Sequence, residues 1–289
     1  MLAGGTRPSD RMSVSAKPMI SSLTGSNGFC ETNSIRIHYL RTGHGGPTLI
    51  ALHGLMGSGS VWTPFARALG EGFDLVAPDA RGHGKSSAPP EGYLYGDHAD
   101  DVCGLIDALA VSRPILVGHS MGGMTAALVA SRLGSELGGV ILVDPTFISP
   151  EWQREVYDSD IFEQHRQFIQ ADRDDLIAEA RGRNASRSSE MIEIVTDSRL
   201  ATDIRALDVL TPPNPDFRTL VGMIRAPTLL VLGGRGVVSL DTAQELARAN
   251  PNLRYEMIED AGHAIPYDEP ERLASLVKPF VDRLGATPQ

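Results

Sequence analysis

The chain has 289 residues, of which 26 are Lys or Arg and 36 are Asp or Glu, so its formal net charge is −10. Its 42% of apolar and 21% of charged residues are ordinary for a globular protein and exclude a disordered chain, a fibrous repeat and a coiled coil. No stretch approaches the roughly 18 uninterrupted apolar residues of a membrane span, and an acidic chain without a basic run is a poor match for nucleic acid or an anionic membrane surface.

The first 27 residues are rich in Gly, Ser, Thr and Pro and show no sustained hydrophobic period, which predicts a flexible N-terminal extension over 1–27. Its basic residues are scattered and no apolar run follows them, so we expect no signal peptide and a cytoplasmic protein. Cys30 and Cys103 do not have the spacing of a metal cage and are interpreted as two reduced thiols in or near the core.

From Phe29 onward, short apolar runs alternate with stripes of apolar residues at helical spacing. This alternation predicts a parallel sheet that is covered by helices on both faces, and therefore an α/β fold. Strands are predicted over 34–40, 48–52, 73–77, 115–117, 140–143, 228–232 and 255–258, and helices over 61–69, 102–109, 121–133, 242–249 and 270–284.

Residues 146–220 break this rhythm, because apolar residues stand at helix-like spacing with many charges between them and no strand-like run occurs. We predict a helical insertion that acts as a lid and shapes a pocket. Trp152, Phe162 and Phe168 are its candidates for lining that pocket, with packing inside the insertion as the alternative for each. The insertion also holds eight arginines between Arg154 and Arg205, which suit a carboxylate-bearing substrate unless they are solvated surface charges.

The segment Gly118-His119-Ser120-Met121-Gly122 fits the pattern G-x-S-x-G, between a predicted strand and a predicted helix. A serine at such a sharp turn needs small neighbours, and the following helix offers free N–H groups and the positive end of its dipole. Ser120 is therefore the predicted nucleophile, with an ordinary strand-to-helix turn as the alternative.

A nucleophilic serine needs oxyanion donors and a base. The backbone N–H of Met121, the residue after the nucleophile, is one predicted donor, and that of Leu55, in the turn after His53-Gly54, is the other. Among eight histidines, only His263 follows the last predicted strand, so it is the predicted general base. His119 adjoins the nucleophile, but adjacent side chains diverge at a turn, so a structural role is expected.

Together these motifs resemble the α/β-hydrolase superfamily, from about residue 35 to residue 284. The resemblance implies an eight-stranded, mostly parallel sheet with helices on both faces and a Ser–acid–His triad. It also implies a helical cap inserted after strand six, over 146–220, between core segments 28–145 and 221–289. No metal and no organic cofactor is expected.

Most members of this superfamily carry the triad acid after strand seven, in a G-x-x-D pattern, but this chain has Gly236 there. Asp241 comes five residues later, in the next predicted helix. The other position that the family uses is the end of strand six, which is Asp144 here. Asp144 is therefore the predicted acid, expected to approach His263 from an adjacent strand about 4.8 Å away. The alternative is an Asp that only caps its strand before proline.

Members with the acid after strand six include haloalkane dehalogenases, cofactor-free ring-cleaving dioxygenases and (acetamidomethylene)succinate hydrolase. Dehalogenases use an Asp nucleophile, so Ser120 disfavours them. The chain is similar to (acetamidomethylene)succinate hydrolase-like members, because Gly236 leaves strand seven without an acid and Asp144 is closely followed by Thr146.

The predicted function is a serine hydrolase, most simply a carboxylic ester hydrolase, that cleaves a small-molecule ester, lactone or activated amide through an acyl-enzyme. One alternative is C–C bond hydrolysis or cofactor-free dioxygenation on the same fold. Oxygen consumption during turnover would distinguish dioxygenation from hydrolysis. Another is a non-catalytic ligand sensor, against which a fluorophosphonate adduct at Ser120 would count. We expect a small-molecule substrate, no nucleic-acid or membrane partner, and a monomer or homodimer.

Overall fold

The structure, a computed structural model, describes residues 25–184 and 187–286. Most of the predicted N-terminal extension, residues 1–24, lies outside these ranges. Ser26 and Asn27, also predicted to be part of it, instead open the first strand, which pairs antiparallel with the second. Within the described ranges, no helix is both long enough and apolar enough to cross a bilayer.

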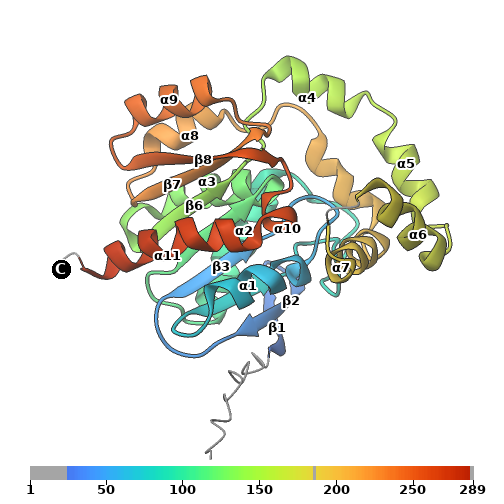
Figure 1. The fold of residues 1–289 in the computed structure, drawn as a ribbon, viewed down its shortest axis with the longest axis horizontal. Coiled ribbons are helices and arrows are strands. Elements are labelled where there is room, and N and C mark those ends of the chain that lie inside the picture. Colours follow the sequence, from blue (N-terminus) through green and yellow to red (C-terminus); the bar gives the residue numbers. More distant parts are fainter. Residues whose placement is uncertain (1–24, 185–186, 287–289) are drawn as a thin grey trace, which may run out of the picture.

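Eight strands form one sheet in the order β1-β2-β4-β3-β5-β6-β7-β8 (Figure 1). Strand β2 is antiparallel to both neighbours and every other pair is parallel, so the predicted mostly parallel sheet is confirmed. The strands are β1 (Ser26–Thr32), β2 (Ile35–Thr42), β3 (Thr48–Leu52), β4 (Asp74–Pro78), β5 (Ile115–His119), β6 (Gly139–Val143), β7 (Thr228–Arg235) and β8 (Leu253–Gly262).

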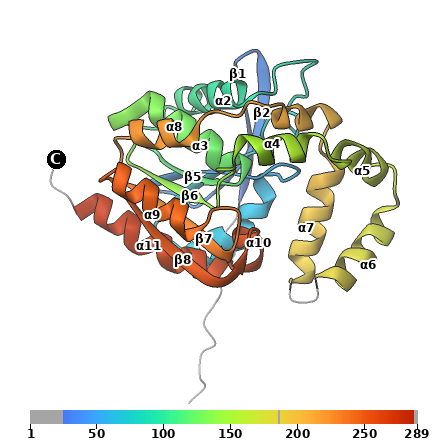
Figure 2. The ribbon, with the colours of Figure 1, turned by 90° about the horizontal axis from the view of Figure 1, so that it is seen from above.

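Helices cover both faces of the sheet, as Figure 2 shows for α2, α3 and α8 on one side and α10 and α11 on the other. Along β3, Leu49 and Ala51 face one apolar cluster while Ile50 and Leu52 face the opposite one. Both faces of a central parallel strand are therefore buried, which explains its uninterrupted apolar sequence. The core helices are α1 (Thr63–Leu69), α2 (Tyr95–Ala108), α3 (Met121–Leu133), α8 (Phe217–Met223), α9 (Leu240–Ala249), α10 (Ile265–Asp268) and α11 (Pro270–Ala286), with short 3₁₀ turns η1 (Gly59–Trp62) and η2 (Gly134–Glu136).

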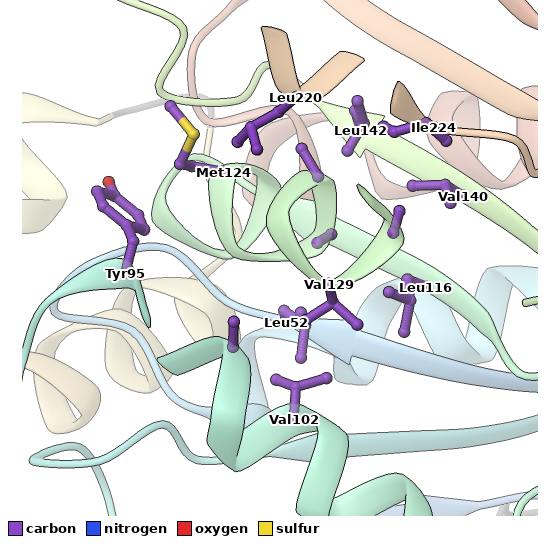
Figure 3. Packing of buried hydrophobic residues seen from close by; sticks show 14 of the residues in the cluster. Leu52, Tyr95, Val102, Leu116, Met124, Val129, Val140, Leu142, Leu220 and Ile224 are labelled. Atoms are coloured by element: carbon purple, nitrogen blue, oxygen red, sulfur yellow. The ribbon is translucent and has the colours of Figure 1, made fainter. Parts of the chain in front are cut away.

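Helix α3 begins directly after Ser120 and is buried between the sheet and its neighbouring helices (Figure 3). Nine of its 13 residues are buried, and the alanines among them allow a close approach to the strands. Figure 3 shows Val129 of α3 near Leu52 and Leu116 of the sheet, with Val102 of α2 below them. Close packing of this kind leaves little freedom for the helix and therefore fixes the turn that precedes it.

Between β6 and α8 the chain forms a helical insertion, in the place predicted for the cap and given that name here: α4 (Pro150–Tyr157), α5 (Ile161–Phe168), α6 (Arg173–Arg183), α7 (Ser189–Leu200) and the 3₁₀ helix η3 (Ile204–Leu210). In Figure 2, α4 crosses from the core to α5, α6 and α7, which lie beside it. Ser149 and Ser188 cap α4 and α7 by accepting backbone N–H groups from the first turn. Helix α8 falls partly inside the predicted cap range, but it packs on α3 and α9 of the core.

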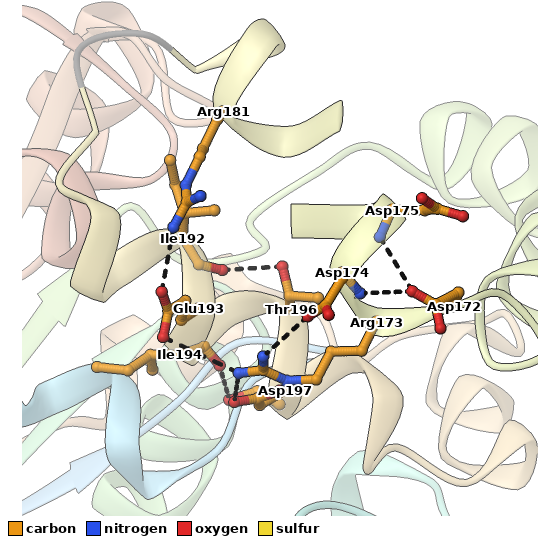
Figure 4. A network of polar contacts seen from close by, with 11 residues as sticks. Asp172, Arg173, Asp174, Asp175, Arg181, Ile192, Glu193, Ile194, Thr196 and Asp197 are labelled. Atoms are coloured by element: carbon orange, nitrogen blue, oxygen red, sulfur yellow. Dashed lines mark hydrogen bonds and ion pairs between the residues drawn. The ribbon is translucent and has the colours of Figure 1, made fainter. Parts of the chain in front are cut away.

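Ion pairs hold two cap helices together (Figure 4). Arg173 of α6 donates to both carboxylate oxygens of Asp197 in α7, at 2.5 and 2.8 Å, and Arg181 donates to Glu193 at 3.2 Å. These side chains are about half exposed, so each pair contributes little stability. Their guanidinium groups are nevertheless occupied within the cap.

Candidate active site

A strained turn presents Ser120 at the carboxyl end of β5. Its backbone has φ 53° and ψ −117°, outside the regions that residues with side chains prefer. A Cβ atom on Gly118 would stand 2.2 Å from the carbonyl oxygen of Gly122, and one on Gly122 would stand 2.3 Å from that of Leu52. Both glycines of the motif are therefore required by close backbone contacts.

The structure brings Ser120, His263 and Asp144 into one hydrogen-bonded chain. The Nε2 atom of His263 lies 3.0 Å from Oγ of Ser120, and Nδ1 lies 2.6 Å from Oδ2 of Asp144. Asp144 is fully buried, whereas the His263 side chain is 39% exposed. The carboxylate also accepts the backbone N–H groups of Val237 at 2.8 Å and Val238 at 3.0 Å, which compensate its loss of hydration.

Asp144 reaches His263 by a route that differs from the sequence-based expectation. The two residues do not come from adjacent strands, because β7 lies between β6 and β8. Asp144 turns off β6 with φ 39° and extends past the end of β7, where Gly236 leaves space. A Cβ atom on Gly236 would stand 2.6 Å from both carboxylate oxygens. Asp241 is exposed in the first turn of α9 and takes no part.

Gly236→Ala is expected to lower kcat by roughly 10²-fold, because the new methyl group displaces the Asp144 carboxylate, and misplacing a catalytic group by about 1 Å has effects of that size. Steady-state kinetics and a thermal unfolding curve on the same sample check this. Gly222→Ala in α8 is the matched control, since its Cβ would meet nothing within 4 Å. Equal kcat values for the two variants would contradict the steric account.

The turn over residues 54–57 lies against Ser120 and carries the backbone N–H of Leu55. It closes with a hydrogen bond of 3.0 Å from Gly57 N–H to the Gly54 carbonyl. Leu55 and Met121 line the same pocket as Ser120, and Met121 is the first residue of α3, where a helix leaves its N–H groups unpaired. The residues that carry the two predicted oxyanion donors thus line the same pocket as the serine.

Two buried histidines hold this turn in place. His53 Nδ1–H donates to the Gly54 carbonyl at 2.8 Å, and His83 Nε2 accepts the N–H of Met56 at 3.2 Å. Burial lowers the pKa of His53 and holds that of His83 well below its usual value, so both rings stay neutral. The sequence predicted no role for His83, and only its contact across the fold reveals one.

His119 supports the loop that carries His263. Its Nε2–H donates to the backbone carbonyl of His263 at 2.8 Å, and its ring packs between those of His263 and Tyr267. Burial lowers the pKa of His119 to about 3, so it remains a neutral donor that fixes the loop carrying His263. This contact fits the structural role that the sequence suggested.

A pocket of about 180 Å³ opens beside the serine and histidine, between the core and the cap. Trp152 lines it, as the sequence predicted. Phe162 and Phe168 are not among the described residues that line it: Phe162 meets the edge of Tyr157, and Phe168 lies 4.0 Å beneath the guanidinium of Arg199. The lining comprises Leu55, Tyr95, Ser120, Met121, Thr146, Ile148, Trp152, Gln153, Val156, Val209, Leu210, Asn214, Val237 and His263.

Comparison with known proteins gives consistent matches. The alpha/beta hydrolase fold family matches residues 47–270. N-formylmaleamate deformylase of Pseudomonas putida is 29% identical over 262 residues, which cover 88% of this chain and 96% of that protein. The 2-(acetamidomethylene)succinate hydrolase of Mesorhizobium japonicum is 28% identical over 257 residues, covering 82% and 88%. A crystal structure of E-2-(acetamidomethylene)succinate hydrolase superposes with a TM-score of 0.75 at 23% identity, covering 90% of this chain and all of the other.

Proposed function

The chain belongs to the α/β-hydrolase superfamily and is a hydrolase, and from this premise we propose that it cleaves a small-molecule carboxylic ester, lactone or activated amide through an acyl-enzyme on Ser120. The observation that carries the proposal is the hydrogen-bonded chain from Ser120 through His263 to Asp144, beside a pocket of substrate size. The cap is the part of the segment predicted over 146–220 that lies between β6 and α8, and residues of its helices α4 and η3 line that pocket.

In the first half-reaction, Nε2 of His263 takes the proton from Oγ of Ser120 as Oγ bonds to the substrate carbonyl carbon. The carbonyl oxygen becomes an oxyanion that accepts the backbone N–H groups of Leu55 and Met121. Asp144 accepts Nδ1–H of His263, which keeps Nε2 free as the base and stabilises the imidazolium that forms. Nε2–H then protonates the leaving alcohol or amine as the old acyl bond breaks.

The second half-reaction repeats these steps with water. His263 removes a proton from a water molecule that attacks the acyl carbon of the ester formed on Ser120. The same two N–H groups hold the second oxyanion, and the proton returns to Oγ as the carboxylic acid leaves. Ser120 loses a proton in the first half-reaction and regains one in the second, and His263 gains and loses a proton in each. The site therefore returns to its starting state with water as the only reactant besides the substrate.

The leaving group can be an alcohol or an amine. The relatives named N-formylmaleamate deformylase and 2-(acetamidomethylene)succinate hydrolase take their names from substrates that contain an amide group, which supports including activated amides with esters and lactones. C–C bond hydrolysis would use the same serine and histidine but would release a carbon leaving group, so product analysis distinguishes it.

A panel of p-nitrophenyl esters of graded acyl length, lactones and N-acyl enamides tests the proposal. We expect stoichiometric acid and alcohol or amine, no oxygen consumption, and covalent labelling of Ser120 by a fluorophosphonate. A protein that cleaves only C–C substrates, or that consumes oxygen, would overturn the assignment to acyl transfer. Absence of both turnover and labelling would leave only a binding function.

A further inference from the structure

Among the described residues, the lining of the pocket beside Ser120 supplies no lysine or arginine for an anionic substrate. Of the described residues that line it, none is Lys, Arg, Asp or Glu, and most are aliphatic or aromatic. Burying a carboxylate there would remove its hydration without supplying a cation in return. The lining of the pocket therefore suits an uncharged acyl group.

The arginines of the cap do not change this. None of the eight is among the described residues that line the pocket. Arg173 and Arg205 are paired with Asp197 and Asp203, and Arg187 donates to both oxygens of Asp268 (Figure 4 shows the first pair). The structure thus gives no support to the carboxylate-bearing substrate that the arginine count suggested.

Two side-chain amides supply polarity on the cap side of the pocket. Gln153 is buried, and its Oε1 accepts the backbone N–H of Asn214 at 2.8 Å while its Nε2 donates to the Ile148 carbonyl at 3.3 Å. Both ends of this amide are therefore engaged with backbone groups. Gln153 fixes the backbone of Asn214, and the following Pro215 restricts it further to extended conformations.

The side chain of Asn214 is different, because its Oδ1 atom is buried and has no hydrogen-bond partner. Buried amide oxygens in folded proteins are nearly always paired. Tyr95 and Thr146 also line the pocket, but their side chains interact with each other, and this contact acts on the pKa of Tyr95. Asn214 Oδ1 is thus an unused acceptor on a positioned residue of the substrate pocket.

We propose that Asn214 determines substrate specificity: the site takes an uncharged acyl group that carries an N–H or O–H donor, and Asn214 Oδ1 accepts that donor. The inference rests on the proposed acyl-transfer function and adds the class of acyl group to it. A purely aliphatic acyl chain fills the same apolar pocket but leaves Oδ1 unpaired, so discrimination arises from this single acceptor.

Three p-nitrophenyl esters with acyl chains of similar length test this: hexanoate, N-acetyl-β-alaninate, which adds an amide N–H, and hemiadipate, which adds a carboxylate. We expect the amide-bearing ester to exceed hexanoate in kcat/KM by about 10-fold, on the scale of one hydrogen bond. The hemiadipate is expected to fall about 10-fold or more below hexanoate.

In Asn214→Leu, the preference for the amide-bearing ester is expected to disappear, mainly through KM, while hexanoate turnover and fluorophosphonate labelling of Ser120 persist. Asn184→Leu, elsewhere in the cap and absent from the pocket lining, is the matched control and keeps the preference. If the wild type hydrolyses hexanoate but shows no preference for the amide-bearing ester, the inference is wrong and the proposed function stands. The same holds if Asn214→Leu keeps that preference. Preference for the hemiadipate also overturns the inference. If the wild type hydrolyses none of the esters and the fluorophosphonate does not label Ser120, the proposed function is wrong, and the inference with it.

Discussion

Ser120→Ala is expected to lower kcat for every hydrolysed substrate by about 10⁶-fold, the loss measured when a triad serine is removed from subtilisin. The alanine keeps Cβ but has no Oγ to accept the acyl group, so His263 has no proton to remove and no covalent intermediate can form. Steady-state assays and intact-mass analysis after fluorophosphonate treatment check this.

The fold should survive that change. Within the part of the chain that the structure describes, Oγ of Ser120 hydrogen-bonds only to His263, and the turn is held by backbone contacts of its glycines. We therefore expect an unfolding midpoint close to that of the wild type. Ser275→Ala, an exposed position on α11, is the control for the serine-to-alanine change itself and keeps full activity. Substantial turnover in pure Ser120→Ala protein would refute the nucleophile assignment.

Asp144→Asn is expected to lower kcat by roughly 10²- to 10⁴-fold with little change in KM, on the scale of the corresponding change in a serine protease. The two carboxylate oxygens accept three N–H groups, from Val237, Val238 and His263. An asparagine must turn its NH₂ group toward at least one of these donors. If it faces His263, the ring is driven to the tautomer whose Nε2 carries a proton and cannot act as a base.

Asp241→Asn is the matched control, because this exposed side chain lies in the first turn of α9. The kcat of this variant is expected to stay at the wild-type level.

A second test moves the acid from the end of β6 to the end of β7. Since a side chain at 236 needs the space of Asp144, Gly236→Asp is made together with Asp144→Gly. Partial recovery relative to Asp144→Gly alone would show that both strand ends can serve His263. A near-normal Asp144→Asn enzyme would exclude Asp144 as the acid.

The interior of the fold could be predicted from the sequence because burial on both faces demands continuous apolar runs. Strands β3, β5, β6 and the first part of β7 have that character, and α3 begins at the residue predicted. Strand β1 was missed because it lies at the sheet edge, where its mostly exposed residues carry no apolar run or clear alternation. Its pairing with β2 is a tertiary contact.

The residues of the candidate site also differ in whether local sequence patterns could predict them. Ser120 and His263 stand in local patterns tied to the ends of strands, so sequence order alone selects them. Asn214 lies in a proline-rich connection that indicates only the end of the insertion, and its place in the pocket depends on Gln153, 61 residues earlier. The partners of the cap arginines could likewise not be predicted from the sequence, since Arg187 pairs with Asp268, 81 residues later.

The space between Gly236 and Asp144 restricts how such a site can change over generations. A side chain at 236 would put its Cβ atom 2.6 Å from the Asp144 carboxylate, and a second carboxylate would add like-charge repulsion. One protein therefore cannot hold both acids in these backbone positions. A lineage that shifts its acid from the seventh strand to the sixth cannot pass through an ancestor with both. It must first lose the old acid, surviving on the activity that the serine, the histidine and the oxyanion donors retain.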